Sequence, residues 1–178
     1  MALDILILSI LRAAPVHGYE LKQRVQRPTL TRLSNNSLYP YLRRFEAAGA
    51  VTSSLEQQDG KPSKRIYAIT DAGRSLFSEL VSTLPPDLAA SDEEFLVRLS
   101  FFGEIDAAAR KSILAARTEF VDARLGQVRA LMAGSAALPE WRALAMDHLI
   151  EQLERERTWL AALAEKAGTE LHVPTGSN

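Results

Sequence analysis

The sequence predicts a mainly α-helical protein with one small β-hairpin. Apolar residues recur at helical spacing through most of the 178 residues. The period changes to two only between residues 51 and 69, which is typical of two half-exposed strands. Pro85 and Pro86 end a helical pattern and mark the boundary between two domains.

Composition excludes several classes of protein and of site. The chain of 178 residues is long enough for one domain or two small ones, its apolar fraction of 47% indicates that it folds, and it contains no cysteine. A disulfide framework, a thiolate metal site and a cysteine nucleophile are therefore excluded. The apolar run at residues 3–11 is too short to span a bilayer and lacks a basic leader and a cleavage site. We expect a cytoplasmic protein with no cofactor and no membrane partner.

The formal net charge of −1 is unevenly distributed along the chain. Residues 1–75 carry 11 Lys and Arg against 6 Asp and Glu, a balance of +5, and residues 76–178 carry 10 against 16, a balance of −6. A basic front part attached to an acidic rear part indicates that only the front part meets a polyanion.

The first elements are two short helices. Residues 3–13 are apolar on nearly every side, so this segment is a helix buried on more than one face or, alternatively, a buried strand. Residues 15–18 form a turn, in which His17 has a packing or capping role. Residues 19–26 form the second helix, whose polar face carries Lys22.

Residues 33–51 are the centre of the front domain. A polar run at residues 34–37 suits a helix N-cap near Ser37, and Pro40 is tolerated in the first turn. Leu38, Leu42 and Phe45 recur at helical spacing, and a glycine at residue 49 ends the helix.

The other sides of this helix carry groups that can read DNA in the major groove. The alternative is a surface helix with a solvated basic face. The candidate contacts on the helix and its polar opening are Asn35, Asn36, Ser37, Tyr39, Arg43 and Arg44.

A hairpin follows the third helix. Residues 51–55 and 64–69 alternate like strands around a turn-rich loop at residues 57–63. Three helices and a hairpin are the order of a winged helix-turn-helix. The hairpin tip carries Lys61, Lys64 and Arg65, which can bind phosphate, although a merely soluble loop would look the same.

Three segments in this order resemble the PadR family of bacterial transcriptional regulators. They are HGYEL at residues 17–21, SLYP at residues 37–40, and Y-x-I-T-x-x-G at residues 67–73. The resemblance implies a winged-helix fold, binding to an operator as a dimer and, usually, repression. It also places Tyr39, Arg43 and Arg44 in the recognition helix and the basic tip residues in the wing.

The rear part is expected to be helical. After a helix at residues 71–84, we expect helices at residues 91–103, 106–134 and 139–168, with Asp106 as the N-cap of the helix at residues 106–134. Their apolar stripes are wider than one neighbouring helix can cover. A further helix must therefore cover them, supplied by the same chain or by a second copy. The segment FLVRLSF at residues 95–101 and a late Trp-Leu pair resemble the helical C-terminal domain of virulence-activator-type PadR proteins, which implies dimerisation.

We therefore expect a PadR-like winged-helix DNA-binding domain at residues 1–84, a helical dimerisation domain at residues 91–168 and a disordered tail at residues 169–178. The predicted function is a dimeric DNA-binding transcriptional regulator, a repressor acting on a palindromic operator. The alternative is a sensor of a small aromatic compound, with a pocket among Phe95, Phe101, Phe102, Phe120, Trp141 and Trp159. An enzyme is not expected, because no catalytic constellation or phosphate loop occurs.

Overall fold

The computed structural model describes residues 1–26, 38–58, 61–134 and 138–167. The described residues fall into two compact units, one drawn from residues 1–82 with 96–101 and the other from residues 83–95 with 102–167. The predicted mainly helical fold with a small antiparallel sheet is confirmed. The described elements of the first unit are α1 (Ala2–Ala13), β1 (Val16–His17), α2 (Gly18–Gln26), α3 (Leu38–Ala47), β2 (Val51–Gln58), β3 (Lys61–Ile69) and α4 (Asp71–Ser82).

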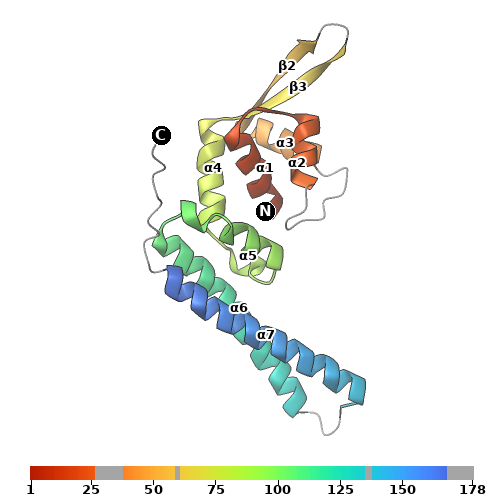
Figure 1. The fold of residues 1–178 in the computed structure, drawn as a ribbon, viewed down its shortest axis with the longest axis vertical. Coiled ribbons are helices and arrows are strands. Elements are labelled where there is room, and N and C mark those ends of the chain that lie inside the picture. The colour runs from red at the N-terminus through yellow and green to blue at the C-terminus, as the bar shows by residue number, and fades with distance from the viewer. Residues whose placement is uncertain (27–37, 59–60, 135–137, 168–178) are drawn as a thin grey trace, which may run out of the picture. The chain divides into compact units, whose positions relative to one another are not determined.

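The helices of the first unit enclose an apolar core. Helix α1 lies between α2 and α4 (Figure 1) and also contacts β3. Its residues Ile5, Ile7 and Leu8 are fully buried, so the segment is the predicted helix and not the alternative strand. Leu21 of α2 and Phe77 of α4 complete the same interior.

Three strands form the sheet, in the order β1-β3-β2, and all pairs are antiparallel. Strand β1 was not predicted, because two residues give no periodic signal and the pairing partner of Val16, Tyr67, lies far along the chain. The wing strands extend well beyond the helices in Figure 1. Both are longer than expected: Glu56 still pairs with Lys64, although the apolar alternation ends at Leu55.

Local hydrogen bonds fix the ends of α3 and the start of α4. Gly49 has a φ of +69°, and the amide of Ala50 donates to the carbonyl of Phe45 at 2.9 Å, which closes the C-terminal turn. The hydroxyl of Thr70 donates to the carbonyl of Gly49 at 2.7 Å and accepts from the amide of Gly73 at 3.1 Å. Thr70 therefore caps α4 and connects it to the end of α3.

The second unit consists mainly of two long helices. Its elements, with α5 shared between the units, are η1 (Pro86–Leu88), α5 (Asp92–Leu99), η2 (Phe102–Glu104), α6 (Ala107–Ala133) and α7 (Glu140–Ala167). Helices α6 and α7 pack side by side as an antiparallel pair (Figure 1). As predicted, the carboxylate of Asp106 caps α6 by accepting from the amide of Ala109 at 2.7 Å.

Helix α5 is shorter than the predicted helix at residues 91–103. The amide of Phe101 donates to the carbonyl of Arg98 at 2.9 Å, a bond spanning three residues that tightens the backbone. The hydroxyl of Ser100 donates to the carbonyl of Val97 at 2.6 Å and competes for the same helical acceptors. The stretch 96–101, which was expected in the C-terminal domain, packs with the first unit.

Candidate nucleic-acid interface

Helix α3 separates a buried stripe from an exposed face. Leu38, Leu42 and Phe45 are buried as their spacing predicts. Tyr39 is 47% exposed, and Arg43, four residues later and so on the same side of the helix, is exposed as well. The expected contacts Asn35, Asn36 and Ser37, together with the expected N-cap, lie outside the described residues.

Arg44 has a different environment from Arg43. Its Nη2 atom donates to Oδ1 of Asp4 in α1, whose carboxylate is almost fully buried. Its guanidinium carbon also lies 4.9 Å from the centroid of the Tyr41 ring and 5.3 Å from that of Phe45. The structure therefore associates Arg44 with α1 and with its own helix.

The wing presents the expected cations on both of its faces. Lys64 and Arg65 are exposed neighbours on β3, so they point to opposite faces of the strand. Lys64 lies opposite Glu56, and Arg65 lies opposite Leu55. Lys61 is the first residue of β3, and its side chain is outside the described part of the structure. Lys22 on α2 is half-buried.

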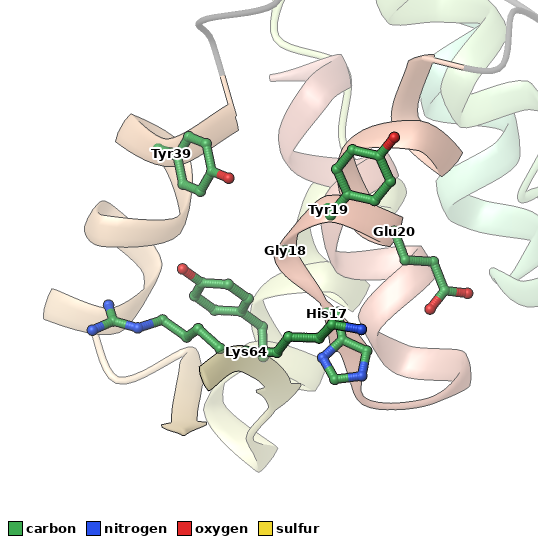
Figure 2. Close-up of a pocket in the computed structure, with 8 residues that line it drawn as sticks. His17, Gly18, Tyr19, Glu20, Tyr39 and Lys64 are labelled. Atoms are coloured by element: carbon green, nitrogen blue, oxygen red, sulfur yellow. The ribbon is translucent and has the colours of Figure 1, made fainter. Parts of the chain in front are cut away.

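A hollow of about 430 Å³ lies where the start of α2, the start of α3 and strand β3 meet. Figure 2 shows Tyr39 on one side of it, Tyr19 and Glu20 on the other, and Lys64 and His17 at its edge. The residues that line it are His17, Gly18, Tyr19, Glu20, Tyr39, Lys64, Arg65 and Tyr67. The structure thus brings together three predicted DNA contacts, which are Tyr39, Lys64 and Arg65.

Gly18 and Tyr67 shape the floor of this hollow. A Cβ atom on Gly18 would lie 3.2 Å from Cε2 of Tyr67, so glycine allows the tyrosine ring to approach the backbone of α2. Burial raises the pKa of the Tyr67 phenol, and the hydrogen bond and charge of Arg65 only partly offset this rise. The phenol therefore stays protonated at neutral pH and remains able to donate a hydrogen bond.

Acidic groups border the same hollow. Nε2 of His17 lies 3.4 Å from Oε2 of Glu56. Oε1 of Glu20 accepts from Nη2 of Arg24 at 2.6 Å. One carboxylate of the wing and one of α2 therefore lie beside His17 and Arg24 at the border of the hollow.

Tyr19 and Tyr67 were not predicted as site residues. Tyr19 is 72% exposed. Both residues belong to the segments HGYEL and Y-x-I-T-x-x-G that carry the family resemblance. Their place in those two segments was the feature of the sequence that could have identified them as site residues.

Residues 7–79 match the model of the transcriptional regulator PadR-like family. These residues form a PadR-like domain. The transcriptional regulator Rv3488 of Mycobacterium tuberculosis is 41% identical over 64 residues, which are 36% of this chain and 58% of that protein. The chain therefore spans less than two thirds of the length of this relative.

Solved structures of PadR are also similar to this chain. Bacillus subtilis PadR in complex with operator DNA has a TM-score of 0.46 at 18% identity, covering 94% of this chain and 99% of the other. Bacillus subtilis PadR in complex with p-coumaric acid has a TM-score of 0.42 at 18% identity, covering 95% of this chain and 100% of the other.

Of the six aromatic residues that were proposed to line a ligand pocket, Phe101 belongs to the first unit. Its ring meets that of Phe77 edge-on, with centroids 5.2 Å apart. Phe102 begins η2 in the second unit. These two neighbours in sequence therefore belong to different units.

Three of the aromatic residues gather around Arg117 in the second unit. The guanidinium carbon of Arg117 lies 5.6 Å from the Phe95 ring centroid and 5.3 Å from that of Phe120. Trp159 meets Phe95 edge-on, with centroids 6.0 Å apart. Trp141 lies on the same helix as Trp159 but about 27 Å away at a rise of about 1.5 Å per residue, so the two tryptophans cannot line one pocket within a chain.

Arg117 itself is already bound by groups of the protein. Its Nε atom donates to Oε1 of Glu156 at 2.6 Å and its Nη1 atom to the carbonyl of Ala89 at 2.6 Å, while Nη2 bonds Oδ1 of Asp92. The side chain is 3% exposed. This arrangement connects η1, α5, α6 and α7.

Neither a metal cluster nor a membrane segment is found among the residues that the structure describes. In the described ranges no three His, Cys, Asp or Glu side chains are close enough to hold a metal ion. None of the described helices is both long and apolar enough to cross a bilayer.

Proposed function

We propose that this PadR-like transcriptional regulator binds an operator as a homodimer and represses transcription from it. The hollow between α2, α3 and β3 carries the proposal, because three elements direct phenol and cationic groups to one place. The phosphate oxygens of DNA accept hydrogen bonds from phenol hydroxyl, ammonium and guanidinium groups.

The geometry supports separate roles for residues that contact DNA phosphates and residues that contact bases. The hollow suits one stretch of DNA backbone, where Tyr19, Tyr39 and Lys64 would bind phosphate oxygens. The exposed face of α3 beside it would then lie in the major groove, with Arg43 facing base edges. Arg65 on the wing would approach the neighbouring groove. On this proposal, phosphate contacts set the register and α3 supplies specificity.

Dimerisation is supported by apolar surface on the second unit. Helix α7 has 28 residues, of which only Leu153, Leu160 and Ala167 are buried among the described residues. Large apolar side chains remain exposed on α6 and α7, namely Leu131, Trp141, Leu144 and Trp159. Exposed apolar side chains on two long helices favour an interface with a second copy, which would place two α3 helices on a palindromic operator.

Selection of DNA from a random pool by the full-length protein tests the function. We expect enrichment of an inverted repeat whose half-sites are separated by about one or two helical turns, or about 34–36 Å per turn. A reporter carrying the enriched site should be repressed when the protein is present. Recovery of no sequence preference at moderate salt would reject the proposal.

A small aromatic acid as effector is a second proposal, favoured by the cation at the centre of the second unit. The Asp92 carboxylate that meets Arg117 is 79% exposed, so an incoming carboxylate would replace it, and the half-buried Phe120 beside Arg117 would contact the ring of the acid. Titration of p-coumaric acid into the protein–DNA complex should release the DNA. Equal retention of DNA with and without the acid would eliminate this effector.

A further inference from the structure

Asp4 is an acidic residue in a helix that is otherwise almost entirely apolar. It lies between Leu3 and Ile5 in α1, and all three residues are buried. An ionised carboxylate in such a place is strongly unfavourable unless it is paired and hydrogen-bonded. The terminal ammonium of Met1 lies 3.7 Å from the Oδ2 atom of Asp4, and a second cationic partner comes from another part of the fold.

Arg44 of α3 supplies that partner from 40 residues along the chain. The Nη2 end of the guanidinium bonds the Asp4 carboxylate, and the guanidinium carbon lies over the Tyr41 and Phe45 rings. The Asp4 side chain is 8% exposed and the Arg44 side chain 59% exposed, so the carboxylate is fixed and the guanidinium reaches in from the surface. A directional bond thus connects α1 to the C-terminal half of α3.

We propose that Asp4 and Arg44 form a pair that sets the orientation of α3, so that Arg44 is a positioning residue of the DNA interface and does not contact DNA. This inference rests on the proposed function. The buried stripe of α3, formed by Leu38, Leu42 and Phe45, is apolar and therefore non-directional. An apolar stripe leaves α3 free to rotate slightly about its own axis. A hydrogen-bonded ion pair restricts this rotation, because its strength depends on distance and angle.

The sign of the effect at Asp4 separates positioning from simple electrostatics. Removing a negative charge beside a DNA interface should strengthen binding to all DNA if only charge matters. If the pair positions α3, Asp4→Ala should instead weaken binding to the selected operator by about tenfold and leave random DNA unchanged. Asp4→Asn keeps the shape of the side chain and serves as the milder variant if Asp4→Ala lowers the folded fraction.

A double-mutant cycle in the full-length protein tests the pair. We would measure operator and random-DNA affinity of Asp4→Ala, Arg44→Gln and the double variant at several salt concentrations. The double variant should bind no more weakly than the weaker single variant, because each change removes the same bond. Arg44→Gln should leave the log–log salt slope unchanged, whereas the wing control Lys64→Gln should reduce it by ~0.9.

Two results would overturn the inference. They are additive losses of affinity in the cycle and a fall of ~0.9 in the salt slope for Arg44→Gln, which would mean a direct phosphate contact. If the wild-type protein selects no DNA sequence, the proposed function fails on its own. In that case the same cycle is measured on the denaturant midpoint, where additive shifts would show that the two side chains do not act as a pair.

Discussion

Arg43 and Lys64 carry charges of the same sign on elements with different tasks. Arg43 lies on the exposed face of α3, where a guanidinium can bond a base edge in two places, which is worth ~1–3 kcal/mol of discrimination. Lys64 on the wing is an ammonium that releases counterions from phosphate, so its loss should reduce the salt slope by ~0.9.

We therefore predict that Arg43→Ala weakens operator binding far more than random-DNA binding. Lys64→Ala should weaken both alike and lower the salt dependence. Titrations of both variants on both DNAs at two salt concentrations measure this difference. Equal losses on the two DNAs for Arg43→Ala would show that this side chain holds phosphate.

Gly73 and Gly126 are helical glycines with opposite surroundings. A Cβ atom on Gly73 would lie 2.0 Å from the carbonyl oxygen of Ala50, which is backbone and cannot move aside, whereas a Cβ on Gly126 meets nothing within 4 Å. We expect Gly73→Ala to cost about 1–3 kcal/mol or more through forced backbone shifts. Gly126→Ala should stabilise α6 by about 0.5–1 kcal/mol. Urea denaturation of both variants checks the signs, and a neutral Gly73→Ala would contradict the packing of α4 on residue 50.

The sequence located helix α3 but did not distinguish its two arginines. Helical spacing is a local signal, and it correctly predicted that Leu38, Leu42 and Phe45 are buried. The partner of Arg44 lies 40 residues away in another helix, where periodicity carries no information. The interruption of an apolar run by Asp4 was the one hint that a cation must come from elsewhere.

At the scale of elements, pairing between distant strands was the main limit of prediction. The expected hairpin is present, but β1 was missed and the wing is longer than the apolar alternation indicates. Polar cross-strand pairs such as Glu56 and Lys64 extend a ladder without leaving a hydrophobic pattern. In contrast, caps were predicted where a single side chain decides, as at Asp106 before α6.

Arg117 joins four elements of the second unit, and its environment predicts a large effect on stability. The guanidinium is buried against the carboxylates of Glu156 and Asp92, so Arg117→Met would leave Glu156 partly buried without its cation. Breaking a buried pair in this way costs about 3–5 kcal/mol. Arg129→Ala is the matched control, because its pair with Glu154 is about half exposed and such pairs contribute about 0–1 kcal/mol. Comparable denaturant midpoints for the two variants would contradict the central role of Arg117.

At the scale of the whole molecule, the exposed apolar surface of α6 and α7 predicts an obligate dimer. Interfaces of long helices are usually larger than ~2,000 Å² and more apolar than transient ones. Trp141→Glu introduces a charge at a side chain that is 80% exposed in one chain, so a monomeric fold tolerates it but a dimer interface does not. Analytical ultracentrifugation should show a dimer for the wild type and dissociation for the variant. A stable wild-type monomer at micromolar concentration would exclude an obligate dimer.

Two fragments of the chain predict how the helical unit contributes to DNA binding. A fragment of residues 1–84 loses the stretch 96–101, including the Phe101 ring that packs on the buried Phe77, whereas a fragment of residues 1–103 retains it. Exposing a buried aromatic contact lowers stability by about 1.5–3 kcal/mol, so the longer fragment should unfold at higher urea concentration.

Both fragments should nevertheless bind the operator ~10²-fold more weakly than the full chain, because neither retains α6 and α7 to tether two half-sites. Where they are folded, their affinity for a single half-site should equal that of the full-length protein, since both fragments contain the PadR-like domain at residues 7–79. Titration of the three proteins on a half-site measures the affinity of one DNA-binding domain. Titration on the complete inverted repeat measures the additional affinity that comes from tethering two half-sites. Full-strength binding of the inverted repeat by residues 1–103 would place dimerisation within the front of the chain and remove the need for the helical pair.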